Sequence, residues 1–313
     1  MKKFLTIIPL VILFCFTFSC QQGEKVATEE TKEEVTSGIV NIDGFELTYS
    51  IEGTGVPCMV IDDPPLMKRV LSSDLRNHFK FIFMDSRYSA QYDKTFDVDK
   101  ITLDTFLDDI DEVRKTLGIE KTCVFGHSIN GLLAYEYARK YSEHATHVIM
   151  NGTPPYWDDQ AWSMWRKKWD SIASDESKAV LKQNWEKMGD KIAKMPPDQA
   201  SLQTYITNRP IYLYNPNYDF TWLFEGLHWN AEIFNHFLEV VMINYDITQK
   251  EPIQIPVFLS LGRYDIVPFS SWEGIEEKFS NFSKHIFEKS AHYAFLEERE
   301  LFDKKLIDWI KSH

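Results

Sequence analysis

Lys121-Thr-Cys-Val-Phe-Gly-His-Ser-Ile-Asn-Gly-Leu-Leu-Ala-Tyr-Glu-Tyr-Ala-Arg139 is the stretch that decides the fold of this chain. Residues 122–125 are an apolar run of strand-forming residues, and apolar residues recur at helical spacing from Ile129 onward. The segment 126–131 must therefore be a sharp turn between a strand and a helix. A serine in that turn, Ser128, exposes its hydroxyl near free backbone N–H groups, which is the geometry that a nucleophilic serine needs. The alternative is a serine in an ordinary loop.

Length and charge limit the classes of protein to be considered. The chain has 313 residues and a formal net charge of −13. This length suits one large α/β domain with an insertion, or two small domains. No basic run could follow a phosphate backbone, so nucleic acid is not an expected partner. The sequence does not indicate an oligomeric state, and no clustered cysteines or histidines suggest a metal site.

The N-terminal segment is not expected to belong to the fold. Two lysines precede an apolar run over residues 4–18, which is typical of an export signal rather than of a membrane-spanning helix. The run ends at Ser19-Cys20, which resembles the bacterial lipoprotein processing site. We therefore expect residues 1–19 to be a signal peptide, Cys20 to carry lipid, and residues 20–37 to be a flexible tether. The protein would then be an exported lipoprotein on a membrane, facing the periplasm or the cell surface; ordinary cleavage nearby is the alternative.

Strands and helices alternate along most of the remaining chain. The alternation predicts a mostly parallel, twisted sheet with helices on both faces, built from residues 38–152 and 249–313. Cys58 and Cys123 lie in apolar strand-like runs, and we expect two buried free thiols. An Asp43-Gly44 hairpin precedes expected strands at 57–61, 80–84, 122–125, 146–150, 255–261 and 284–288, with helices expected at 66–78, 103–117, 129–138, 272–279 and 296–310.

The alternation stops over residues 153–248, which are helical in pattern and contain seven of the nine tryptophans. We interpret this segment as a helical cap inserted between two strands of the sheet. Most of its tryptophans are expected to pack the cap itself. Because ligand sites are largely apolar and aromatic, we expect Tyr156, Trp157 and Trp222 to line a substrate pocket.

Three short sequence motifs resemble motifs of a known family. Besides the turn at Ser128, Leu261-Gly-Arg-Tyr-Asp265 and Ala291-His-Tyr-Ala-Phe-Leu-Glu297 resemble the acid and histidine motifs of the α/β-hydrolase superfamily. Asn130 and Ala291 depart from the family, which has glycine at both positions; the first glycine comes one place later here. The resemblance covers residues 38–312 and implies the α/β-hydrolase fold.

The resemblance assigns the order Ser128, Asp265, His292 to a catalytic triad, and each residue follows an expected strand. His292 would take the proton of Ser128, and Asp265 would orient the imidazole and stabilise its charged form. The alternatives are a turn aspartate and a helix-capping histidine. Within the superfamily, Met84-Asp-Ser-Arg-Tyr-Ser89 is similar to a loop of the proline iminopeptidase branch. Members of that branch release N-terminal proline, close relatives hydrolyse esters or lactones, and none needs a cofactor.

The loop after the first buried strand departs most from the family. The family has H-G-G-P-G there, and one N–H of that loop is an oxyanion donor; this chain has Asp62-Asp-Pro-Pro-Leu66. Proline has no N–H, so Pro64 removes the usual donor. Ile129 N–H remains as one donor, and Leu66 N–H or a cap side chain such as Tyr156 is a candidate for the other. Alternatively, Asp62 or Asp63 binds a cationic amine of the substrate.

Taken together, these motifs favour a serine hydrolase that cleaves an ester or amide bond of a small ester or short peptide through an acyl-enzyme. A proline iminopeptidase-like aminopeptidase is the first alternative. The second alternative is a degenerate hydrolase fold that acts as a surface binding module. The complete triad argues against the binding module, whereas the loop at residues 62–65 argues for it.

Overall fold

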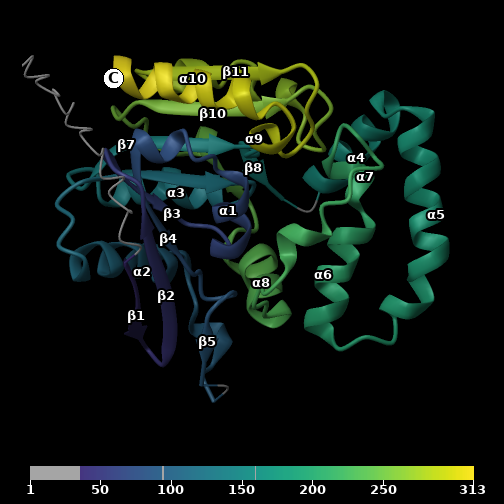
Figure 1. The fold of residues 1–313 in the computed structure, drawn as a ribbon, viewed down its shortest axis with the longest axis horizontal. Coiled ribbons are helices and arrows are strands. Elements are labelled where there is room, and N and C mark those ends of the chain that lie inside the picture. The colour runs from purple at the N-terminus through teal and green to yellow at the C-terminus, as the bar shows by residue number, and fades with distance from the viewer. Residues whose placement is uncertain (1–35, 94, 159) are drawn as a thin grey trace, which may run out of the picture. The chain divides into compact units, whose positions relative to one another are not determined.

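The computed structural model describes residues 36–93, 95–158 and 160–313 (Figure 1). The expected signal peptide, Cys20 and nearly all of the expected tether lie outside these residues, so the lipid anchor stays a prediction. Within the described part of the chain, no helix is both long enough and apolar enough to span a bilayer.

A mostly parallel sheet forms the core, as predicted. Its strand order is β1-β2-β4-β3-β6-β7-β10-β11, with β5 beside β2. Strand β2 pairs antiparallel with β1, β4 and β5, and the other pairings are parallel. The strands are β1 (Thr36–Ile42), β2 (Phe45–Glu52), β3 (Val56–Val60), β4 (Phe79–Met84), β5 (Gln91–Tyr92), β6 (Thr122–His127), β7 (Ala145–Asn151), β10 (Val257–Gly262) and β11 (Phe282–Phe287).

Helices cover both faces of this sheet. Alternate residues of β3 point to opposite faces, so Met59 packs with helices α2 (Leu103–Thr116) and α3 (Asn130–Lys140). Cys58 and Val60 pack on the other face with α1 (Pro64–Val70), α9 (Ala294–Glu297) and α10 (Arg299–Ser312). Cys58 lies beside Cys123 of β6, and both are buried free thiols among the described residues, as expected.

Two expected helices are shorter than the sequence pattern suggested. The helix expected over residues 66–78 is α1 followed by a separate 3₁₀ turn (Leu75–Asn77), because Ser-Ser-Asp at 72–74 favours turns over a helix interior. The helix expected over 272–279 is a pair of 3₁₀ turns (Phe269–Trp272 and Glu276–Lys278). Gly274 separates them with φ of 78°, a left-handed conformation that ends a helix.

The segment 153–248 lies between β7 and β10 and is mainly helical. A short antiparallel pair, β8 (Tyr156–Trp157) with β9 (Tyr245–Asp246), joins its two ends. In Figure 1, α4 to α7 gather at one end of the sheet, and α8 lies between them and the sheet. The helices are α4 (Ala161–Ile172), α5 (Asp175–Ile192), α6 (Pro197–Thr207), α7 (Arg209–Tyr212) and α8 (Ala231–His236), followed by a π-helical turn (Phe237–Val241).

Two glycines allow α3 to approach the sheet closely. A Cβ atom at Gly126 would overlap the backbone carbonyl of Asn130, and a Cβ atom at Gly131 would overlap the hydroxyl of Thr153. The second glycine is therefore needed at position 131, where the helix touches the residue that begins the cap. At position 130, the asparagine side chain has a different partner, because its Nδ2 donates to the Tyr88 hydroxyl at 2.7 Å.

This contact predicts different outcomes for two glycine substitutions. Gly131→Ala should lower the free energy of unfolding by about 1–3 kcal/mol, because the new methyl group overfills the contact with Thr153. Gly189→Ala is the matched control, since a Cβ atom there meets only the Trp185 ring at 3.7 Å within α5. That control should raise the stability by roughly 0.5–1 kcal/mol. Urea unfolding measures both, and equal stability of the two variants would contradict the contact.

Candidate active site

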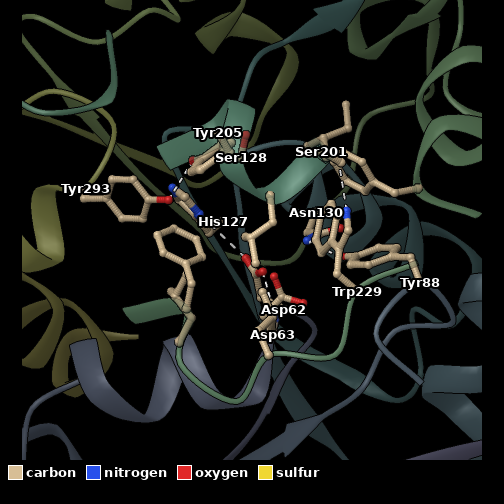
Figure 2. Close-up of a pocket in the computed structure, with 16 residues that line it drawn as sticks. Asp62, Asp63, Tyr88, His127, Ser128, Asn130, Ser201, Tyr205, Trp229 and Tyr293 are labelled. Carbon is tan, nitrogen blue, oxygen red and sulfur yellow. Dashed lines mark hydrogen bonds and ion pairs between the residues drawn. The ribbon is translucent and has the colours of Figure 1, made fainter. Parts of the chain in front are cut away.

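A cavity of about 120 Å³ lies where the sheet meets the cap (Figure 2). Its core wall comes from the loop after β3, the loop after β4 and the turn between β6 and α3, and its cap wall is mainly apolar and aromatic. The lining residues are Asp62, Asp63, Leu66, Tyr88, His127, Ser128, Ile129, Asn130 and Tyr293 from the core, with Ser201, Leu202, Tyr205, Phe224, Leu227, Trp229 and Phe234 from the cap.

Ser128 occupies a strained turn at the wall of this cavity. Its φ is 56°, a left-handed conformation that a serine rarely adopts. Two backbone hydrogen bonds hold it there: Ser128 N–H donates to Asn151 O of β7 at 2.8 Å, and Gly131 N–H donates to Ser128 O at 3.0 Å. Strand β6 ends at His127 and α3 begins at Asn130, so the strand-turn-helix arrangement predicted around Ser128 is present.

Asp265 and His292 form a buried pair. His292 Nδ1 lies 2.9 Å and 3.1 Å from the two carboxylate oxygens of Asp265. Asp265 is 1% exposed, and its Oδ1 also accepts a hydrogen bond from Val267 N–H at 3.0 Å. The backbone N–H of His292 donates to Tyr212 O of the cap at 2.9 Å, which fixes the histidine loop. The carboxyl group of Asp265 therefore contacts the imidazole through Nδ1 and is itself held by Val267 N–H.

His127 connects this pair to the turn that contains Ser128. Its ring centroid lies 4.6 Å from that of His292, and its Nε2 is 3.1 Å from His292 O. Burial, followed by the nearby His292, lowers the pKa of His127 well below its ordinary value, so the ring is neutral. The Ser128 hydroxyl itself forms no hydrogen bond to any described residue, and its contact with His292 stays a prediction. Such contacts often tighten only when substrate binds.

The same cavity contains two buried carboxyl groups, Asp62 and Asp63, at 6% and 7% exposure. Asp63 N–H donates to Asp62 Oδ1 at 2.8 Å. Within the described residues, Asp62 Oδ2 and Asp63 Oδ1 have no hydrogen-bond partner, and no lysine or arginine lines the cavity. Unpaired buried charge is costly, so these groups must either hold protons or receive a cation.

Burial dominates the ionisation of both groups. It raises the pKa of Asp62 to about 6, although the hydrogen bond from Asp63 N–H, and the nearby Asn130 side chain and His127 backbone, act in the opposite direction. It raises the pKa of Asp63 well above the ordinary value, and the charges of Asp62 and Asp85 raise it further. The two carboxyl groups therefore differ in their readiness to ionise, as adjacent carboxyl groups commonly do.

Only some of the other expected site residues line the cavity. Ile129 and Leu66 line the cavity, and Leu66 lies in the first turn of α1, where N–H groups lack helical partners. Tyr156, Trp157 and Trp222 are not among the described residues that line it. Trp157 instead donates its indole N–H to Leu238 O at 3.0 Å within the cap.

Four aromatic residues that were not among the expected substrate-binding residues line the cavity instead. Tyr88 accepts a hydrogen bond from the Asn130 side chain at 2.7 Å, which explains a use for asparagine at the position of the family glycine. Trp229 donates its indole N–H to Ser201 Oγ at 3.1 Å. The hydroxyl groups of Tyr205, from the cap, and Tyr293, from the core, lie 2.6 Å apart (Figure 2). Tyr88 and Tyr293 each stand in a motif quoted from the sequence, whereas no local motif marks Tyr205 or Trp229.

Glu297 ties the histidine loop to the cap. Its Oε2 accepts Ala291 N–H at 2.8 Å, and its Oε1 accepts Tyr214 N–H at 2.7 Å and Asn215 N–H at 3.3 Å. Burial raises the pKa of this carboxyl to about 7, while the three N–H donors act to lower it. Glu297 thus links the loop that contains His292 to the cap segment at Tyr214 and Asn215 through hydrogen bonds.

Comparison with known proteins agrees with this architecture. A family profile described as alpha/beta hydrolase fold matches residues 64–299. The AB hydrolase superfamily protein YclE of Bacillus subtilis is 30% identical over 277 residues, covering 88% of this chain and 98% of that protein. The proline iminopeptidase of Saccharolobus solfataricus is 26% identical over 255 residues, covering 77% of this chain and 80% of that protein.

A solved structure gives the same result for the fold. The esterase EaEST from Exiguobacterium antarcticum superimposes with a TM-score of 0.59 at 20% identity, covering 87% of this chain and 98% of that chain. This chain therefore belongs to the α/β-hydrolase fold family. It is a hydrolase-family enzyme whose relatives include proline iminopeptidases, as the sequence resemblance predicted.

The ionisation of Asp62 predicts a pH-dependent effect on stability. Because its pKa is raised in the folded state, its stabilising contribution is complete at low pH and is lost as the pH rises through about 6. Asp62→Asn keeps the oxygen that accepts Asp63 N–H and removes the ionisation. Its melting temperature relative to the parent protein should therefore increase between pH 5 and pH 8, by roughly 2–4 °C.

Asp190→Asn, at an exposed position of α5, is the control for removing one acidic group. Thermal unfolding at each pH separates the two variants. A melting-temperature difference for Asp62→Asn that stays constant with pH would show that Asp62 does not ionise in this range.

Proposed function

We propose that this protein is a serine hydrolase in which Ser128 attacks the ester or amide carbonyl of a small substrate. The single observation that supports this best is the left-handed Ser128 at the cavity wall, in a chain whose Asp265–His292 pair lies at the ends of neighbouring strands. A strained serine costs stability and persists where its position is useful.

In the proposed reaction, Ser128 Oγ forms a bond to the carbonyl carbon while its proton passes to His292 Nε2. Asp265 accepts the Nδ1–H hydrogen bond of the imidazolium and balances its charge. Ile129 N–H, directly after the nucleophile, donates to the developing oxyanion. Collapse of the intermediate releases the leaving group with the proton from His292, and water then hydrolyses the acyl-enzyme by the same steps in reverse order.

The cavity favours a small substrate with an apolar part. Its cap wall includes Tyr205, Phe224, Trp229 and Phe234, and it has room for a compact acyl or aminoacyl group. An aminopeptidase of the proline iminopeptidase type is the second candidate. The observation that favours it is the pair of unpaired carboxyl oxygens on Asp62 and Asp63, which could receive the ammonium group of a peptide N-terminus.

Two substitutions test the nucleophile and its support. Ser128→Ala should abolish covalent labelling by a small fluorophosphonate and reduce turnover of p-nitrophenyl esters and aminoacyl-nitroanilides to background. Asp265→Asn should reduce kcat by roughly 10³–10⁴-fold, because the imidazole would lose its orienting acceptor. Ser171→Ala, at an exposed position of α4, is the control.

The substrate panel also separates the candidates. Preferential turnover of the proline nitroanilide would favour the aminopeptidase, and preferential turnover of neutral esters would favour the esterase. Equal and negligible turnover by the parent protein and Ser128→Ala, with no labelling of either, would contradict a hydrolase and favour the surface binding module.

We also propose that Cys20 carries a lipid anchor, with the Ser19-Cys20 word and the preceding apolar run as support. Cys20→Ala should move the protein from the membrane fraction to the soluble fraction after cell lysis, as detected by immunoblotting. Cys58→Ala is a control, since this cysteine is buried in the sheet. Membrane fractionation that persists in Cys20→Ala would contradict the anchor.

A further inference from the structure

The oxyanion of the proposed reaction lacks its usual second donor. Ile129 N–H supplies one hydrogen bond, but Pro64 begins α1 where the family uses a loop N–H, and proline cannot donate. Asp63, the residue before Pro64, is the N-cap residue of α1 and lines the cavity together with Ser128 and Ile129. The carboxyl group of Asp63 therefore lies beside the position where the usual donor is missing.

We propose that the Asp63 carboxyl group, in its protonated form, donates the second hydrogen bond to the oxyanion. This inference rests on the proposed function of Ser128. Asp63 Oδ1 is buried, and within the described residues it has no hydrogen-bond partner, so the group is not occupied in holding the loop. A protonated acid gives the cavity a donor without adding negative charge beside the oxyanion.

The neighbouring Asp62 explains why the proton belongs to Asp63. Asp62 Oδ1 accepts Asp63 N–H at 2.8 Å, and this hydrogen bond favours negative charge on Asp62. Two adjacent buried carboxylates cannot both ionise without a large repulsion, so ionisation of Asp62 keeps the proton on Asp63.

The groups that surround Asp63 act in the same direction. Burial raises its pKa well above the ordinary value, and the charges of Asp62 on the same loop and Asp85 after β4 raise it further. Tyr88 and Tyr293 face it from the core, and burial raises the pKa of both, so they are neutral. No lysine or arginine stands among the described residues of the cavity wall to favour an ionised Asp63.

The attack of Ser128 on the carbonyl carbon needs no reactant beyond the substrate and the residues named above. As Ser128 Oγ bonds to the carbonyl carbon, the C=O π electrons move to oxygen, and the Ser128 proton goes to His292 Nε2. The Asp63 O–H bond stays intact, while its hydrogen bond to the oxygen strengthens as negative charge develops. When the intermediate collapses, those electrons return to the C=O bond and the hydrogen bond weakens again.

Kinetics of two Asp63 variants on a neutral p-nitrophenyl ester test this role. Asp63→Ala removes the donor, so kcat should fall about a hundredfold or more, while KM changes by less than about threefold. Asp63→Asn replaces O–H by an amide N–H, so its kcat should lie well above that of Asp63→Ala. Asp190→Asn is the control for the loss of one acid.

The pH profile gives a signature that a structural role would not produce. In the parent protein, kcat should fall as the pH rises through the raised pKa of Asp63, because the donor loses its proton. In Asp63→Asn this alkaline limb should disappear, because the amide does not titrate. If Asp63→Ala does not fold, as judged by circular dichroism, the profile of Asp63→Asn decides alone.

Several results would overturn the inference. Asp63→Ala that is as fast as the parent protein would show that the carboxyl group is not a donor. An alkaline fall of kcat that is unchanged in Asp63→Asn would also show that the Asp63 carboxyl group is not the donor. An increase of KM confined to aminoacyl substrates would assign Asp63 to amine binding instead. Labelling of Ser128 by a fluorophosphonate in the parent protein distinguishes these failures from a failure of the proposed hydrolase itself.

Discussion

The close approach of α3 to the sheet is the constraint on which the rest of the site depends. Gly126 and Gly131 leave no room for side chains against Asn130 and Thr153, so the chain between β6 and α3 must turn within very few residues. The turn forces Ser128 into a left-handed conformation at the wall of the cavity. The stability of the packed core offsets this local strain, since the cost is only about 1–3 kcal/mol.

Much of the fold could be predicted because its determinants are local. Apolar runs with period 2 or 3.6 located the strands and helices, and the parallel order followed from their alternation, as the structure confirms. The errors occurred where periodicity is a weak guide. Between Trp272 and Phe279 the apolar residues recur at near-helical spacing, but Gly274 breaks the segment into two 3₁₀ turns.

The candidate site was only partly predictable, for a physical reason. Asp265 and His292 stand in recognisable words at strand ends, and the structure pairs them. The aromatic wall depends instead on how the cap helices fold over the sheet, which no local pattern encodes. Trp229 lines the cavity whereas Trp222 does not, although both belong to the same short segment. The loop of Asp62 and Asp63 stands out in the sequence as a departure from the family. Its burial, which controls its ionisation, is a property of the three-dimensional packing and cannot be read from a local pattern.

The bonds of Glu297 have a consequence for engineering the cap. One carboxylate accepts N–H groups from the histidine loop and from the cap segment at Tyr214 and Asn215, and His292 N–H donates to Tyr212 O of the same segment. Replacing the cap by joining a new segment at its two ends would therefore remove contacts from within the cap as well. A chimaera with a foreign cap would need to reproduce the backbone contacts of residues 212–215 with Glu297 and His292, because these contacts hold the loop that contains His292.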